Sequence, residues 1–101
     1  MERDQPLVVV AIFRARPGRS AALGAALRAL VEPTRKEDGC LNYDLHQAID
    51  DTDVYFFHET WRSVEDHRAH LDTPHVRHIL AISPDLIKEP IREYKGRRAE
   101  A

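Results

Sequence analysis

The apolar run Leu7–Phe13 predicts the first β-strand of the chain. Its residues are mostly β-branched and both of its alternating faces are apolar, which is the pattern of a central strand covered on two sides. The motif Arg16-Pro17-Gly18 ends the strand, because proline and glycine favour turns. We therefore expect this strand in the middle of a sheet.

The next segment predicts an amphipathic helix that begins near Ser20 and ends at Gly39. Its apolar residues recur at helical spacing, at Leu23, Leu27, Leu30 and Val31. Pro33 has no amide hydrogen to donate to the Ala29 carbonyl, so we expect it to kink the last turns. Gly39 fits the left-handed residue on which helices commonly end.

Two strands, residues 40–49 and 54–61, then predict a hairpin. Apolar and polar residues alternate along the first strand, and its apolar face holds Leu41, Tyr43 and Leu45. This alternation favours a half-buried strand near a sheet edge. The polar turn Asp50–Asp53 joins it to a strand that is apolar on both faces at its start, which indicates a second central strand.

Helix-start signals predict that helical structure resumes after the hairpin. Ser63 precedes two acidic residues of a first turn, as in a capping box. The motif Thr73-Pro74 places proline at the first position of another helix. After Ser83-Pro84 we expect a last strand over residues 88–95, and Pro90 within it favours an edge position.

The order β-α-β-β-α-β predicts an α+β, ferredoxin-like fold with an antiparallel four-stranded sheet. Right-handed crossovers place the first and third strands in the middle of this sheet. The helices must then cover one face, although both central strands are apolar on both faces. A second copy of the chain would cover the other face, so we predict a homodimer through the sheet face, a dimeric α+β barrel.

Length and charge narrow the class of protein. The 101 residues fit one domain, 1–101, with an ordered core of about 7–95. The net charge of −2 offers no footprint for nucleic acid. Cys40 is the only cysteine, and no apolar run has the length of a signal peptide core or a membrane span. We therefore expect a cytoplasmic protein with no nucleic-acid or membrane partner.

Histidines are the first candidates for chemistry, because four of the six fall in one short segment. The pairs His67/His70 and His75/His78 each have a spacing that places both rings on one helix face. Pro74 separates the pairs, and we expect no metal site. The motif Thr73-Pro74 puts His75 in a first helical turn, where the helix dipole favours a neutral imidazole that can accept a proton. The alternative is a local hydrogen bond that fixes the loop.

Glu59 and Trp61 share one strand face with two further aromatic residues. Burial among aromatics would raise the pKa of the Glu59 carboxyl and suit it to general base catalysis. Trp61 can stack on a flat ligand. The alternatives are an ion pair between Glu59 and an arginine, and a core position for Trp61. No glycine-rich phosphate loop is present, and we expect no flavin, nicotinamide or other cofactor.

Three segments resemble the antibiotic biosynthesis monooxygenase (ABM) family, and most closely its quinol monooxygenase-like members. They are Lys36–Tyr43, Glu59–Ser63 and Ala69–His75, and Arg16–Gly18 adds to the resemblance. The resemblance implies a dimeric barrel with a ligand pocket between sheet and helices. It also implies that molecular oxygen oxidises a quinol or related electron-rich aromatic in this pocket, without metal or flavin.

The resemblance also implies site residues. Trp61 matches a tryptophan of the polyketide-oxidising members, but Phe57 stands where they have asparagine and His67 where they have tyrosine, which argues against their mode of substrate binding. His70 stands where the haem-degrading members have tryptophan, so haem degradation is not expected. The candidate catalytic residues are His75, His70 and Glu59. The candidate substrate-binding residues are Trp61, Tyr43, Phe57 and His67.

Three functions follow as hypotheses. The first is a cofactor-independent monooxygenase acting on a quinol, with a small aromatic substrate and oxygen as its partners. The second is an isomerase of the autoinducer-phosphate-processing kind, which shares the fold and the Thr73–His75 segment and works without oxygen. The third is a non-catalytic dimer that binds a small molecule.

Overall fold

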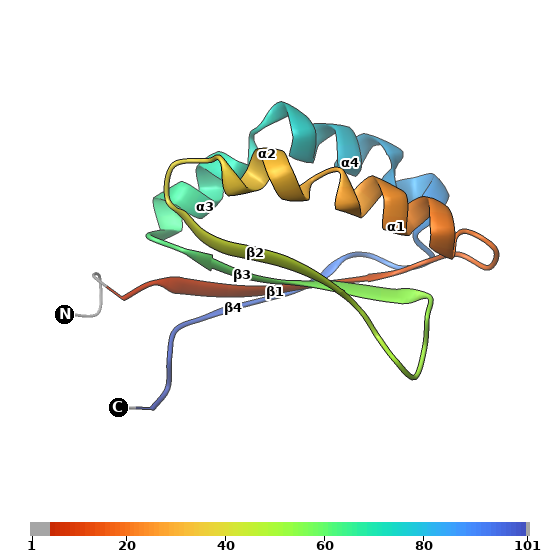
Figure 1. Cartoon of the computed structure of the whole chain (residues 1–101), viewed down its shortest axis with the longest axis horizontal. Helices are drawn as coiled ribbons and strands as arrows, with labels where there is room; N and C mark the ends of the chain where they lie inside the picture. The colour runs from red at the N-terminus through yellow and green to blue at the C-terminus, as the bar shows by residue number, and fades with distance from the viewer. Residues whose placement is uncertain (1–4, 101) are drawn as a thin grey trace.

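The computed structural model describes residues 5–100. Its strands are β1 (Leu7–Arg14), β2 (Cys40–Gln47), β3 (Val54–Trp61) and β4 (Arg92–Gly96), and its helices are α1 (Ser20–Arg28), α2 (Val31–Arg35), α3 (Val64–Leu71) and α4 (Pro74–Leu86). All four helices lie on one side of the sheet (Figure 1). No helix in this range is long and apolar enough to cross a membrane.

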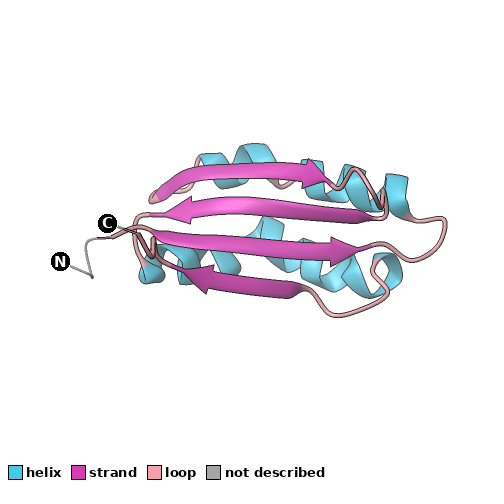
Figure 2. Cartoon of the chain, turned by 90° about the horizontal axis from the view of Figure 1, so that it is seen from below, coloured by secondary structure: helices cyan, strands magenta, loops and turns pink. Residues whose placement is uncertain are grey.

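The strand order β2-β3-β1-β4 confirms the predicted ferredoxin-like sheet. Every neighbouring pair is antiparallel, and the view from below shows the four strands in front of the helices (Figure 2). The two strands predicted to be central, β1 and β3, lie in the middle. Strands β2 and β4 form the edges, as the alternation in β2 and the proline expected in the last strand indicated.

The core lies between the sheet and the helices. Alternate residues of β1 point into it and are buried, namely Leu7, Val9, Ala11 and Phe13. The intervening residues of β1 are only partly covered, because no helix of residues 5–100 lies on that side of the sheet (Figure 1). The apolar outer face that the sequence indicates is therefore present in the folded chain.

The predicted first helix is two helices, and the expected kink at Pro33 is wrong. Helix α1 ends at Arg28, and the Leu30 amide donates to the Leu27 carbonyl at 3.1 Å in a tightened turn. Helix α2 begins at Val31, so Pro33 occupies its first turn. Amides of a first turn have no acceptor within the helix, and proline therefore costs nothing there.

The last strand begins later than the predicted residue 88, because α4 continues through Pro84 to Leu86. Proline has no amide hydrogen for the Leu80 carbonyl, and the Ser83 hydroxyl donates to that carbonyl at 3.1 Å instead. The last strand consequently begins at Arg92 rather than at residue 88.

Strand β2 contains an irregularity that alternation did not reveal. The pairing with β3 shifts register between Cys40 and Asn42. Leu41 is therefore 57% exposed, although it was predicted to share the buried face with Tyr43. The extra residue of a bulge leaves the ladder locally unpaired, which explains the change of face.

Candidate active site

A cavity of about 250 Å³ lies between the sheet and the helices. Its walls come from every layer of the fold. The sheet contributes Ala11, Phe13, Tyr43, Phe57, Glu59 and Glu93, and the helical layer contributes Leu30, His67, His70, Leu71, Val76, Ile79 and Leu80. Two of these, Leu71 and Leu80, are also exposed to solvent. The chamber is mostly apolar, with a few ionisable groups, which is typical of small-molecule sites.

Glu59 is the buried carboxyl group of this cavity, with 3% of its surface exposed. Burial raises its pKa to about 7, and the hydrogen bond from Trp61 Nε1 to Glu59 Oε1, at 2.9 Å, partly opposes this rise. Beside it, the Tyr43 and Phe57 rings stack with centroids 4.4 Å apart. A carboxyl group with this pKa can accept a proton near neutral pH.

His67 and His70 bring two buried imidazoles to the cavity from one face of α3. Burial lowers the pKa of His67 to about 4, and the neighbouring His70 lowers it further. Burial also lowers the pKa of His70, although the hydrogen bond to Glu37 opposes this effect. Both rings are therefore neutral at pH 7, and neutral imidazole can accept a proton.

Glu37 is the site residue that sequence reasoning missed. It lies in the connection between α2 and β2, and its Oε2 atom is 2.9 Å from His70 Nδ1 and 2.7 Å from His75 Nε2. Gly39, two residues later and with φ of +88°, turns the chain into β2. A Cβ atom at Gly39 would overlap the side chain of Asp66 in α3, so this turn packs tightly against that helix. The sequence signal that could have identified Glu37 is its position two residues before Gly39, the predicted left-handed glycine.

The cluster Glu37, His70 and His75 is also the group that could hold a metal ion, with ligand atoms within 4.8 Å of one another. Zinc–nitrogen and zinc–oxygen bonds are about 2.0–2.1 Å long, so neighbouring ligands of a tetrahedral ion stand roughly 3.3 Å apart. Both nitrogens lie closer than this to a single carboxylate oxygen. These distances fit two hydrogen bonds that share one acceptor.

The structure places the predicted site residues in three groups. Five of them line the cavity: Tyr43, Phe57, Glu59, His67 and His70. Trp61 is fully buried behind them, with its ring centroid 4.7 Å from that of His70. His75 lines a second groove, between α1 and α4, together with Ala29 and His78. Its Nε2 atom contacts Glu37, which also contacts the cavity residue His70.

The fold and the cavity define the class of protein: a ferredoxin-like α+β domain with an aromatic-lined small-molecule chamber between sheet and helices. The family model of the antibiotic biosynthesis monooxygenases matches residues 6–81. The chain therefore belongs to the antibiotic biosynthesis monooxygenase family.

Individual relatives agree with this assignment. The putative monooxygenase Rv0793 of Mycobacterium tuberculosis is 37% identical over 85% of this chain and 84% of its own length. The uncharacterized protein sll1783 of Synechocystis is 30% identical over 91% of this chain, which spans 64% of that relative. The crystal structure of PA3566 from Pseudomonas aeruginosa superposes with a TM-score of 0.92 at 34% identity, covering 97% of this chain and 98% of that one.

Proposed function

We propose that the protein is a cofactor-independent monooxygenase that oxidises a quinol or a related electron-rich aromatic with molecular oxygen. The observation that carries this proposal is Glu59, a buried carboxyl group with a pKa of about 7 beside the stacked rings of Tyr43 and Phe57. Triplet oxygen reacts slowly with closed-shell molecules, but a deprotonated quinol can transfer an electron to it. The protein must then orient a flat ring, exclude water and remove a proton.

The reaction balances without an external reductant. A hydroquinone with a free ring position and one O₂ give a hydroxyquinone and one water. One oxygen atom forms the new carbon–oxygen bond and the other leaves as water. The quinol supplies all four electrons that O₂ requires. Its two hydroxyl protons and one ring proton pass by way of bases in the cavity to the departing oxygen, which leaves as water, and to the new hydroxyl.

The cavity supports a small, flat substrate. Its volume of about 250 Å³ lies below the range of about 300–1,000 Å³ that is typical of ligand pockets, which favours one or two fused rings. Glu59 faces it from the sheet and His70 faces it from α3. A ring bound between these layers has one proton acceptor on each side, which suits the two hydroxyls of a quinol.

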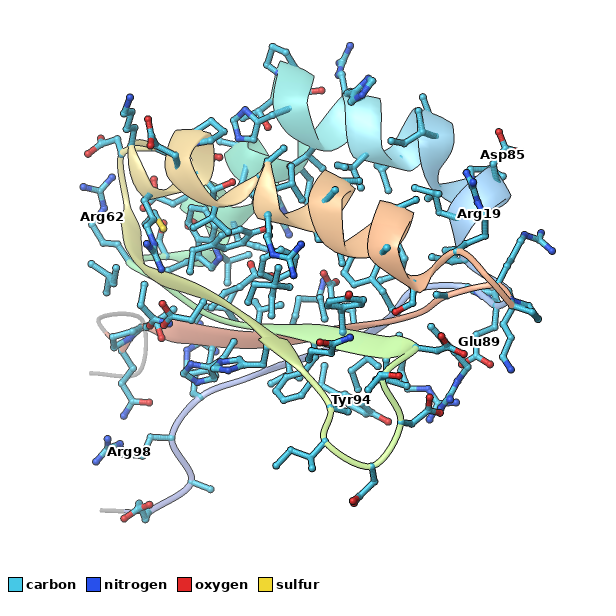
Figure 3. All side chains as sticks on the ribbon, turned by 45° about the vertical axis from the view of Figure 1, so that its right-hand side comes forward. Arg19, Arg62, Asp85, Glu89, Tyr94 and Arg98 are labelled. Carbon is cyan, nitrogen blue, oxygen red and sulfur yellow. The ribbon has the colours of Figure 1, made fainter. Side chains whose placement is uncertain are left out.

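We also propose that the protein is a homodimer through the outer face of the sheet. The half-buried residues Val8, Val10 and Ile12 of β1 and Phe56 of β3 form an apolar stripe on that face. Tyr94 of β4 pairs with Val10 and lies on the same side, away from the helices (Figure 3). A second sheet packed on this stripe would remove it from water.

Oxygen uptake with a panel of reduced benzo- and naphthoquinones tests the proposed activity. We expect uptake above the uncatalysed rate and, with ¹⁸O₂, one labelled atom in the hydroxyquinone product. The variant Glu59→Gln should lower kcat on the order of 10²-fold, because general bases typically contribute 10²–10⁴-fold. Wild-type protein that never exceeds the uncatalysed rate would contradict the proposal, as would conversion of a substrate at full rate without oxygen.

A further inference from the structure

Three polar side chains lead from the cavity toward the surface. His70 Nδ1 lies 2.9 Å and His75 Nε2 lies 2.7 Å from the same Oε2 atom of Glu37. The exposed fraction of the side chain rises from 4% in His70 to 14% in Glu37 and 22% in His75. The residues come from three segments, the last turn of α3, the α2–β2 connection and the first turn of α4. The tertiary fold therefore builds this cluster.

The shared oxygen fixes the protons in this cluster. An ionised carboxylate only accepts hydrogen bonds, so both nitrogens that contact Glu37 must carry hydrogen. For a neutral His70, hydrogen on Nδ1 leaves the lone pair on Nε2, at the opposite edge of the ring. His70 lines the cavity, so a bound molecule would lie beside this ring. A carboxylate that holds an imidazole in this way also stabilises the imidazolium formed when Nε2 accepts a proton.

We propose that Glu37 is a positioning residue that holds His70 as the Nδ1–H tautomer, with Nε2 free to accept a proton from a substrate hydroxyl, and that His75 anchors Glu37. In the step, the substrate O–H bond breaks, its electron pair stays on the oxygen, and the proton bonds to Nε2. The catalytic part of this inference rests on the proposed function. The arrangement of protons does not, and it can be measured without a substrate.

The surroundings of His70 make Glu37 the dominant charge on this ring. The titratable groups that face His70 come from each element packed on it, and they are Glu37, His67, His75, Tyr43 and Glu93. Glu37 is the one that contacts a ring nitrogen at hydrogen-bond distance among residues 5–100. Trp61 packs against the ring face. Loss of the Glu37 charge should therefore change the protonation of His70 directly.

Long-range ¹H–¹⁵N spectra of the histidine rings test the inference. We expect wild-type His70 in the Nδ1–H tautomer at pH 7. The variant Glu37→Leu, which has no acceptor for Nδ1–H, should populate the Nε2–H tautomer. Both Glu37→Leu and Glu37→Gln should lower the pKa of His70 by about one unit, because a nearby negative charge favours the imidazolium. The matched control is Glu32→Gln on the exposed part of α2, where the acid pairs with Lys36. It should leave both properties unchanged.

Three outcomes would overturn the inference: Nε2–H as the main wild-type tautomer, a tautomer that Glu37→Leu does not alter, or stoichiometric Zn²⁺ binding by wild type that Glu37→Gln abolishes. In the last case the cluster is a metal site, and its nitrogens are ligands. With an active quinol, Glu37→Gln should lower kcat at least tenfold with KM within about twofold. If wild type takes up no oxygen with any quinol but His70 is found as the Nδ1–H tautomer, the proposed function is refuted. The role of Glu37 in positioning the His70 ring would still stand.

Discussion

At the scale of single residues, the site depends on ionisable groups held in an apolar chamber. Glu59 is nearly inaccessible, and its contact with Trp61 does not cancel the effect of burial on its pKa. The neighbouring acids Glu93 and Glu37 raise the pKa further. A group that titrates near pH 7 can take a proton from a substrate and release it afterwards.

The pH dependence of the reaction should report this group. Only the ionised Glu59 can accept a proton, so kcat should rise with pH and level off above about 7, the pKa of its carboxyl group. Steady-state oxygen uptake between pH 5 and 9 measures this profile. In Glu59→Gln the rise near pH 7 should be absent. If kcat of Glu59→Gln still rises with pH and has the same midpoint near pH 7, another group is responsible for the titration.

Stability should depend on the same carboxyl. Its pKa is about 7 in the folded protein and 4.5 ordinarily, so the folded state binds more protons between these values. The free energy of unfolding should therefore fall as pH rises from about 4.5 to about 7 through this group. Glu59→Gln should be more stable than wild type at pH 8, by up to roughly 3 kcal/mol, and of similar stability at pH 4.5.

Urea denaturation at the two pH values checks this expectation. Glutamine retains an oxygen that accepts the Trp61 hydrogen bond, so packing is preserved. The matched control is Glu65→Gln, at an exposed position of α3, which should change stability little at either pH. Destabilisation by Glu59→Gln at pH 8 would show that the ionised carboxylate is stabilised by its surroundings.

The sequence pattern predicted the site residues that lie on strands. It did not predict Glu37, which lies outside the regular elements. Period-two alternation places Tyr43, Phe57 and Glu59 on one face, and all three line the cavity. Glu37 lies in an irregular connection, 33 residues from His70 along the chain. No local period links two such positions, because their contact depends on how α3 packs over the α2–β2 turn.

At the scale of elements, strand order could be predicted because two runs are apolar on both faces and two are not. Helix ends were less predictable. Pro33 marks the first turn of α2 and Pro84 lies within α4, where Ser83 satisfies the free Leu80 carbonyl. The register shift that exposes Leu41 left no mark in the alternation. Such features depend on hydrogen bonds that a hydrophobic pattern does not encode.

Gly39, in the turn that carries Glu37, should be sensitive to substitution. Its φ is +88°, and alanine there would also overlap Asp66, the capping partner of α3. The strain of a left-handed residue is about 1–2 kcal/mol, and overpacking adds about 1–3 kcal/mol. Gly39→Ala should therefore lower the free energy of unfolding by at least about 2 kcal/mol.

Gly18→Ala is the matched control for this measurement. Gly18 also has a positive φ, of +77°, but a Cβ atom there would meet nothing within 4 Å. Chemical denaturation should show only the cost of backbone strain in Gly18→Ala. Equal losses in the two variants would mean that the contact with Asp66 relaxes easily, and that the turn does not hold Glu37 rigidly.

At the scale of the whole molecule, residues 5–100 leave one side of the sheet without a cover. The helices occupy the other side (Figure 1), and the outer stripe includes apolar residues of both central strands. The sequence indicated this surface, since its central strands are apolar on both faces. The partner that covers this surface is a separate molecule. The hydrophobic pattern of one chain shows that a cover is needed but does not identify it.

The proposed dimer should be sensitive to a charge at the centre of the stripe. In Val10→Glu the carboxylate would be buried without a partner in a dimer, but largely solvated in a single protomer. Sedimentation velocity at micromolar concentration should show dimeric wild type and monomeric Val10→Glu. Ile49→Glu, in the hairpin and 94% exposed, should remain dimeric. Wild type that sediments as one folded chain would contradict the proposal.

The central claim is that the reaction takes place in the cavity between the sheet and the helices. The most direct test compares two alanine-to-leucine variants. It measures their oxygen uptake with a quinol that the wild-type protein oxidises. Ala11→Leu fills the floor of the cavity, whereas Ala29→Leu makes the same change in the groove between α1 and α4. We expect Ala11→Leu to fold and to lose uptake, and Ala29→Leu to retain it. If folded Ala11→Leu takes up oxygen at the wild-type rate, the reaction takes place elsewhere in the molecule.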